Sequence, residues 1–315
     1  WQTGQKVVIK KKENWWGDAL KDQGMYFDIN PSKIVYQTIN DQTTAKEAMI
    51  AGKVDVMRGI KAKDFKELLN TKKFTDNFKN HTPPQMAYTY LGLNVRKPMF
   101  SDKRTRKALA HLIDVDKIID KIALGYGTRA VGPIHPAKKK QYNNNIKPYE
   151  YSPEKAKELL AEAGWNDTDG DGVLDNTING EKMKFEMSYL YNQGNDSRKA
   201  VGLMFQEEAR KIGITVNLVA QDWSIFLENT KQHDFDMYYG AWISTPIPND
   251  HKQIYHTSSY NGGSNYTGFG NDETDALIDA IRVEIDEDKR AELNHKFQEI
   301  LHDECSYIFL YNPME

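Results

Sequence analysis

The sequence is poor in cysteine, in long apolar runs and in excess charge of one sign. Cys305 is the single cysteine, so no disulfide bond can form within the chain. It lies in an apolar stretch, which predicts a small buried hydrophobe. No apolar run approaches the roughly 20 residues that a membrane-spanning helix needs. The formal net charge is -3, so nothing attracts a polyanion and we predict no nucleic-acid partner.

The common enzyme motifs are also absent. There is no Gly-x-Ser-x-Gly elbow, no His-Glu-x-x-His pair and no phosphate loop ending in Gly-Lys-Ser/Thr. Gly125, Gly127 and Gly132 have the wrong spacing for a dinucleotide loop and follow a helix rather than a strand. The eight histidines are scattered without metal-ligand spacing. We therefore predict that the protein is not an enzyme, although a hydrolase whose serine, histidine and acid converge only in the fold stays open as an alternative.

The length and the pattern of the chain favour an α/β protein with two domains. A chain of 315 residues exceeds one typical core. Residues 1–93 contain short alternating runs, two of which predict strands near residues 7–9 and 34–38 with some burial on each face. From residue 94 helices and strands alternate. The first residue is Trp1, not methionine, and we expect the chain to be part of a longer one.

A strand, a helix and a second strand follow one another in the middle of the chain. Met183 to Tyr189 alternates apolar and polar residues, which predicts one strand with a buried face. A helix ending at Gly213 follows, and then a strand from Ile214 to Leu218. This spacing predicts a right-handed crossover in a parallel sheet. A third strand is expected over 235–242, and two helices over about 272–285 and 288–302.

One loop has the residues of a calcium site. Its carboxylates occupy loop positions one, three, five and nine, and Gly172 stands at position six, where such loops turn sharply. The candidate ligands are Asp167, Asp169, Asp171, Val173 and Asp175. Position twelve is Ile178, where a bidentate acid is expected, and Glu181 reaches the site only by a different path. Two interpretations stay open: a structural Ca²⁺ site, or a polar turn without metal. No other cofactor is required.

Aromatic residues gather around the predicted third strand. Trp223, Tyr238, Tyr239 and Trp242 belong to this strand or to the turn before it. Alternation places Tyr239 on the face opposite Tyr238. At the carboxyl end of a parallel strand such residues line clefts, and in the interior they pack in a core. For the group as a whole the sequence favours a cleft wall.

Several modest motifs occur in the order typical of one family. They are Tyr90-Leu91-Gly92-Leu93-Asn94, Pro98-Met99-Phe100-Ser101-Asp102, Arg104-x-Arg106-Lys107-Ala108-Leu109, Tyr151-Ser152-Pro153-Glu154-Lys155-Ala156, Asp234-Phe235-Asp236 with Gly240-x-Trp242, and Asn265-Tyr266-x-Gly268-Phe269. With these motifs the chain resembles family 5 solute-binding proteins, the receptors of oligopeptide, dipeptide and nickel importers. The resemblance covers nearly the whole chain.

The resemblance implies a fold and a biological role. The fold would be the two-lobed, type II clamp of periplasmic binding proteins. Residues 1–93 would form a partial first lobe, residues 94–310 a largely complete second lobe, and residues 311–315 the start of the return to the first lobe. The protein would be an extracytoplasmic monomer, periplasmic or lipid-anchored. It would close on a solute about a hinge near Leu91–Asn94 and then dock on the membrane subunits of an ABC transporter.

The resemblance also implies ligand-facing positions. By position these are Asn192, Trp223, Tyr239, Trp242 and Thr245. Peptide-binding members carry an aspartate, which holds the peptide's amino terminus, where this chain has Thr245; Asp250 offers a carboxylate further along the loop. We expect an oligopeptide ligand, with a metal chelate, a sugar or another small solute as the alternative. A calcium-stabilised module that binds a protein partner through residues 167–175 is the alternative of another class.

Overall fold

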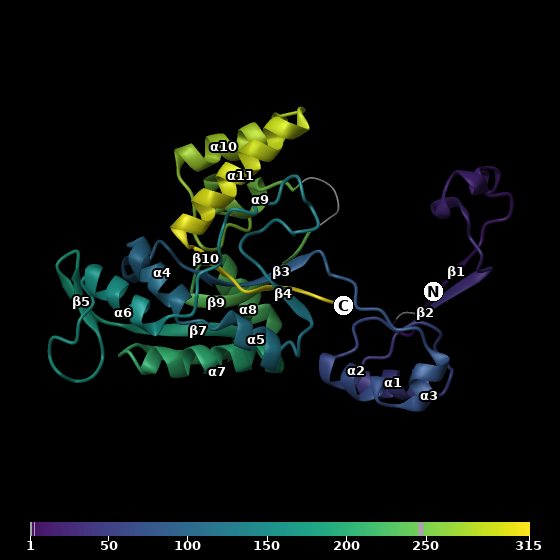
Figure 1. Ribbon diagram of the computed structural model, residues 1–315, viewed down its shortest axis with the longest axis horizontal. Helices are drawn as coiled ribbons and strands as arrows, with labels where there is room; N and C mark the ends of the chain where they lie inside the picture. Colours follow the sequence, from purple (N-terminus) through teal and green to yellow (C-terminus); the bar gives the residue numbers. More distant parts are fainter. Residues whose placement is uncertain (1, 3, 245–248) are drawn as a thin grey trace. The chain divides into compact units, whose positions relative to one another are not determined.

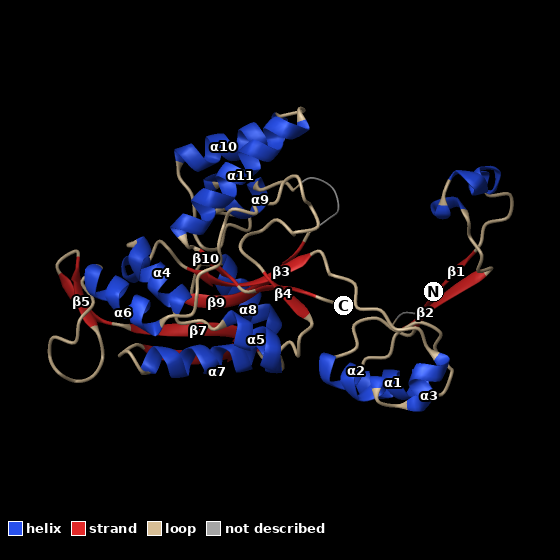
Figure 2. Ribbon diagram, in the orientation of Figure 1, coloured by secondary structure: helices blue, strands red, loops and turns tan. Residues whose placement is uncertain are grey.

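The computed structural model describes residues 2, 4–244 and 249–315. The chain divides into two compact units, Trp1–Asn80 and His81–Glu315. Each unit has buried apolar side chains of its own. In the first unit these include Met49, Phe65, Leu68 and Phe74. The second unit holds a central sheet with helices on both faces (Figures 1 and 2).

The first unit combines a two-stranded ribbon with three helices. Strands β1 (Lys6–Lys10) and β2 (Lys33–Gln37) pair antiparallel. The helices are α1 (Gln42–Ile50), α2 (Ala62–Leu69) and α3 (Lys72–Asn77). Both predicted strands therefore exist. Every residue of β1 and β2 is exposed, so the burial expected on their faces is wrong: no described residue covers the ribbon.

The second unit is built on a five-stranded sheet with the order β10-β3-β9-β7-β8. The strands are β3 (Ala87–Leu93), β7 (Glu186–Asn192), β8 (Thr215–Gln221), β9 (Met237–Ile243) and β10 (Tyr307–Phe309). Strand β7 runs parallel to β8 and to β9, whereas β3 is antiparallel to β9 and β10. Helix α7 (Asp196–Arg210) connects β7 to β8. The predicted strand–helix–strand crossover is confirmed.

Two groups of helices cover the two faces of this sheet. Helices α4 (Lys103–His111), α5 (Val115–Lys121), α6 (Pro153–Glu162) and α7 contribute to one core cluster. Helices α8 (Trp223–Lys231), α9 (Lys252–Tyr255), α10 (Asp272–Val283) and α11 (Glu287–Glu304) contribute to the other. Tyr239 belongs to the first cluster and Tyr238 to the second, which confirms the predicted alternation.

One predicted strand is divided into two elements. The run Met183–Tyr189 was expected to form a single strand. Instead β5 (Asp175–Ile178) and β6 (Glu181–Lys184) form a hairpin, and β7 begins after Phe185. The reason is local, since the Phe185 amide donates to Leu174 O at 2.7 Å and Phe185 is fully buried. The chain therefore turns into the core between the hairpin and the sheet.

The boundary between the units differs from the one expected after residue 93. Residues 81–93 belong to the second unit because β3 lies between β9 and β10. Leu91 and Leu93, within the segment expected as a hinge, are 0% exposed. Residues 311–315 also belong to this unit, where β11 (Tyr311–Pro313) pairs with β4 (Gly127–Arg129). That the two units are the first and second lobes stays a prediction.

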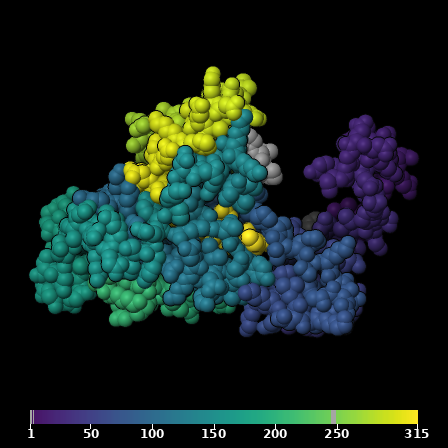
Figure 3. All heavy atoms as spheres, in the orientation of Figure 1, coloured from purple at the N-terminus to yellow at the C-terminus, as the bar shows by residue number. Residues whose placement is uncertain are grey.

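Helix α11 packs against a loop from the middle of the chain. Gln298 Nε2 donates to Gln141 O at 2.8 Å, and Asn143 Nδ2 donates to Glu299 Oε1 at 2.8 Å. Figure 3 shows yellow C-terminal atoms adjoining teal atoms of this loop. Cys305 is 0% exposed, as predicted, and burial raises the pKa of its thiol to about 12. Within the described parts of the chain, no helix has the length and apolarity required to cross a bilayer.

Candidate functional site

Three parallel strands finish at the same end of the sheet, and we call this end, where their last residues lie, the carboxyl edge. Strand β7 ends at Asn192, β8 at Gln221 and β9 at Ile243. Asn192 and Gln221 are directly paired in the register. Their side-chain oxygens, Oδ1 and Oε1, are buried and accept no hydrogen bond from any described residue. Buried acceptors normally have a donor, so this edge has acceptor capacity that the described chain leaves unused.

An open aromatic face stands beside these acceptors. Trp223 is the first residue of α8, two positions beyond the end of β8, and is 54% exposed. Its ring stacks on Phe226 with centroids 5.5 Å apart and an interplanar angle of 16°. Phe226 is buried, which fixes the orientation of the Trp223 ring. Ile243 at the end of β9 is 77% exposed. The edge therefore presents apolar surface to a ligand.

Sequence reasoning missed a third component, Arg198. It lies in the first turn of α7, where its amide donates to the capping Asn195 side chain at 3.0 Å. Its guanidinium carbon lies 5.1 Å from the ring centroid of Tyr239 and 6.0 Å from those of Trp223 and Phe226. Burial lowers its pKa. The available signal was a basic residue at the positive end of a helix dipole, where acidic residues are favoured.

The structure separates the predicted ligand-facing residues. Trp223 and Tyr239 come together around Arg198, and Asn192 ends the neighbouring strand. Tyr239 is only 3% exposed, so its ring supports Arg198 and does not form open surface. Trp242 is half-buried and stacks on Tyr266 at 6.4 Å, on the face of β9 opposite Tyr239. Thr245 lies outside the described residues.

The carboxylate offered as a substitute for the missing aspartate is already engaged. Asp250 Oδ2 accepts from Arg282 Nε at 3.1 Å, and its Oδ1 accepts from the Lys252 amide at 3.0 Å. These contacts tie Asp250 to α9 and α10. Asp250 thus has a local structural role in this conformation.

The aspartate-rich loop gathers three of its carboxylates. Oxygens of Asp167, Asp169 and Asp175 all lie within 4.8 Å of one another. Backbone amides organise the turn, since Gly170 N and Gly172 N donate to Asp167 at 2.7 and 3.0 Å. Thr168 Oγ1 donates to Asp175 at 2.6 Å and is the main cause of the lowered pKa of that carboxyl. These hard oxygen donors are of the type that Ca²⁺ prefers.

Two lysines of β6 already neutralise this loop. Lys182 Nζ lies 3.4 Å from Asp169 Oδ2 and 3.4 Å from Asp175 Oδ2. Lys184 bonds Asp171 and is the main cause of that residue's lowered pKa. Asp171 is not part of the group of carboxylates formed by Asp167, Asp169 and Asp175. Because position twelve is an isoleucine in β5, the donor set fits calcium only in part, and Ca²⁺ binding by residues 167–175, Val173 included, stays a prediction.

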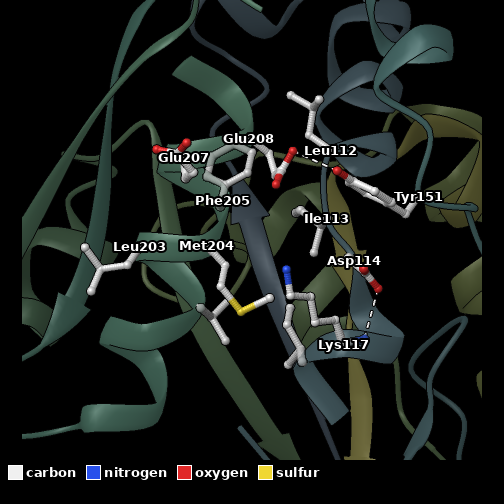
Figure 4. A pocket seen from close by; sticks show the side chains of 12 residues that line it. Leu112, Ile113, Asp114, Lys117, Tyr151, Leu203, Met204, Phe205, Glu207 and Glu208 are labelled. Atoms are coloured by element: carbon white, nitrogen blue, oxygen red, sulfur yellow. Dashed lines mark hydrogen bonds between the residues drawn. The ribbon is translucent and has the colours of Figure 1, made fainter. Parts of the chain in front are cut away.

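A separate cavity of about 320 Å³ lies between α5 and α7 (Figure 4). Its lining includes Ile118, Val201, Met204 and Phe205, with Glu207 and Glu208 also on its wall. Those carboxylates are occupied: Tyr151 and Lys211 bond Glu208, and Arg210 bonds Glu207. None of the predicted ligand-facing residues lines this cavity. The edge at Asn192, Gln221 and Trp223 is therefore the better candidate site.

The chain is similar to known proteins over nearly its whole length. Residues 1–265 match the family model for the middle part of bacterial extracellular solute-binding proteins, family 5. The oligopeptide-binding protein AppA of Bacillus subtilis is 32% identical over 99% of this chain and 55% of its own length. The nickel-binding periplasmic protein of Escherichia coli is 26% identical over 96% of this chain and 55% of its own length. The chain thus spans about half the length of these curated relatives.

Solved structures of proteins in this family share the fold of this chain. The structure of AppA from Bacillus subtilis in complex with a nonapeptide matches with a TM-score of 0.78 and 31% identity, covering 100% of this chain and 59% of that one. The predicted fold class is confirmed: this is an α/β chain with the type II periplasmic-binding-protein fold.

Proposed function

Because the chain belongs to the bacterial extracellular solute-binding proteins of family 5, we propose that it is part of the substrate-binding component of an ABC importer and that its ligand is an oligopeptide. The similarity to an oligopeptide-binding protein over nearly the whole chain supports this choice. The site would lie in a cleft between two lobes. The second unit would contribute the carboxyl edge of its parallel strands.

The observation that carries the proposal is the open Trp223 ring beside unused acceptors. An extended peptide has a row of backbone N–H donors, and such donors would satisfy Asn192 Oδ1 and Gln221 Oε1 once these partly exposed side chains turn toward the ligand. The exposed indole face would pack against peptide side chains without strict selectivity. Recognition through main-chain groups and aromatic surface suits a receptor that accepts many sequences.

Binding needs no covalent chemistry. Ligand contacts from both lobes would stabilise the closed form, which would dock on the importer's membrane subunits. We propose that the protein is not an enzyme, acts as a monomer and binds no nucleic acid. Family 5 proteins are extracellular, and a lipid anchor or a periplasmic location is our proposal for this one.

A metal chelate is the second candidate ligand. Thr245 replaces the acid expected for holding a peptide's ammonium group, and a nickel-binding protein is among the relatives. A chelate would use the same edge and would leave the fold assignment unchanged.

The test is mass spectrometry of the small molecules released when the full-length protein, purified gently, is denatured. Peptides in the released fraction would support the proposal, and a metal chelate or a sugar would replace the ligand. A Trp223→Ala variant purified in parallel should release much less of the same molecule. If nothing is released and no peptide pool raises the unfolding temperature, the receptor proposal fails.

A further inference from the structure

Arg198 is a partly buried cation for which the described chain supplies no anion. Its guanidinium lies on the rings of Tyr239 from β9 and of Trp223 and Phe226 from α8. Its Nη1 is buried and makes no hydrogen bond to any described residue. No carboxylate of the described residues forms an ion pair with it. These contacts hold the guanidinium in place but leave its charge uncompensated.

A fully buried arginine of the same unit, Arg106, shows the usual arrangement. Arg106 is 3% exposed, and its Nη2 donates to the Glu304 carboxylate at 2.8 Å. Its Nη1 donates to Phe100 O at 2.6 Å. Arg106 is thus paired and hydrogen-bonded, as buried charges generally are. Arg198 is less buried than Arg106, but its Nη1 is shielded from solvent and has none of these partners among the described residues.

The surroundings of Arg198 disfavour a cation in other respects. It occupies the first turn of α7, where the helix dipole is positive. Desolvation opposes its charge, and aromatic faces offset only part of that cost. A ligand anion beside the guanidinium would offset both the desolvation of its charge and the repulsion by the positive end of the helix dipole. The position is also suitable, because Arg198 contacts Trp223, whose exposed ring we place in the ligand site.

We infer that Arg198 is the anion-binding residue of the ligand site and that the ligand presents a carboxylate to its guanidinium. This inference rests on the proposed function as a peptide receptor. The planar fork of an arginine matches a carboxylate with two parallel hydrogen bonds. In a peptide the carboxylate is either the C-terminal group or an acidic side chain. Both sources have the same chemistry, and Arg198 would favour peptides that bring one of them to this edge.

The test measures binding of defined peptide pools to the full-length protein by isothermal titration calorimetry. The first pool contains peptides without Asp or Glu and with a free C-terminus, and the second contains the same peptides amidated. A third pool is amidated and carries one Glu in each peptide. The variants are Arg198→Met, Arg198→Lys and, as the control, Arg210→Met on the same helix, where Arg210 is exposed and paired with Glu207.

The wild type should bind the first or the third pool, which carry a carboxylate, about thirtyfold or more tighter than the second pool, which carries none. Preference for the first pool assigns the C-terminal group, and preference for the third assigns a side chain. Arg198→Met should bind all pools within about twofold of one another, Arg198→Lys should keep part of the preference, and Arg210→Met should keep all of it.

Three results would overturn the inference, and they differ in what else they imply. If wild type and Arg198→Met discriminate between the pools equally, Arg198 is not the anion-binding residue, whereas the receptor function stands. If Arg198→Met lowers the unfolding temperature of the ligand-free protein and leaves discrimination unchanged, the anion comes from the protein itself. If the wild type binds none of the pools, the peptide-receptor proposal has failed and the inference fails with it.

Discussion

The guanidinium carbon of Arg198 lies 5.1 Å from the centroid of the Tyr239 ring, so a residue of α7 is held by a residue of β9. Tyr239 itself is 3% exposed. In the proposed site Tyr239, which the sequence predicts to face the ligand, would act indirectly by supporting the guanidinium of Arg198. The positive charge of the proposed site would come from α7, and β9 would supply the aromatic ring on which it lies.

Truncation of Trp223 should weaken ligand binding more than folding. Trp223 is 54% exposed, so Trp223→Ala removes less buried surface than truncation of a core aromatic residue and should lower the unfolding temperature only modestly. Loss of its aromatic face should weaken peptide binding about tenfold or more. Calorimetric titration checks this, with Ile225→Ala as control, since Ile225 is 51% exposed on the same helix. Equal affinity losses in the two variants would contradict a specific role for Trp223.

Enlarging Gly240 should destabilise the second unit. A Cβ at this position would lie 2.3 Å from Cζ and 2.5 Å from Oη of Tyr90. Tyr90 cannot move easily, because it is 1% exposed and its hydroxyl bonds that of Tyr238 at 2.8 Å. Gly240→Ala should therefore lower the free energy of unfolding by about 1–3 kcal/mol. Urea denaturation measures this.

The control for Gly240 is Gly132→Ala. An added Cβ there would meet its nearest neighbour, Gln298, at an ordinary 3.8 Å. Its free energy of unfolding should stay close to that of the wild type. If both variants have the same stability, the close packing between β9 and β3 does not limit side-chain size at Gly240.

The sequence predicted the parts of the fold that depend on local periodicity. Alternation in β9 placed Tyr238 and Tyr239 on opposite faces, and the spacing around α7 predicted parallel pairing of β7 and β8. Periodicity reports which side chains can share a face, but it does not report what covers that face. The exposed residues of β1 and β2 therefore could not be predicted from their alternating pattern.

The candidate site was harder to predict because its groups meet only in the folded chain. Asn192 was found through a resemblance of motifs, and Trp223 through the aromatic cluster as well as that resemblance. Arg198 carries no motif, and its role depends on rings contributed by β9 and α8. The boundary between the two compact units lies before β3 and not after residue 93 for a similar reason, since β3 is fixed in the second unit by pairing with β9 and β10, both distant in sequence.

Acid should destabilise the protein through His251. This residue is 2% exposed, its Nε2 donates to Asn294 Oδ1 at 2.8 Å, and burial lowers its pKa from 6.5 to about 4. The unfolded chain therefore binds a proton more readily than the folded one between these values. The stabilisation is complete above about pH 6.5 and is lost as the pH falls through 4, by up to about 3 kcal/mol.

Urea denaturation at pH 7, 5.5 and 4.5 measures this loss. His251→Gln removes the titrating group and should make the free energy of unfolding less dependent on pH over this range. His81→Gln, at an exposed position, should keep the pH dependence of the wild type. An unchanged pH dependence in His251→Gln would show that other groups cause the acid sensitivity.

Removal of the two lysines that face the aspartate-rich loop should reveal whether it binds calcium. Lys182 and Lys184 neutralise Asp169, Asp171 and Asp175. Without these ammonium groups the carboxylates repel one another, so Lys182→Ala/Lys184→Ala should unfold a few degrees below the wild type in chelator. Because a divalent cation would restore the balance of charge, millimolar Ca²⁺ should recover most of this loss in the double variant and raise the unfolding temperature of the wild type less.

Two further variants are the controls. Adding Asp169→Asn should abolish the recovery by Ca²⁺. Lys155→Ala, which removes a lysine paired with Glu158 on α6, should not respond to Ca²⁺ more than the wild type. A double variant insensitive to Ca²⁺ would identify residues 167–175 as a polar turn whose carboxylates are balanced by lysine alone.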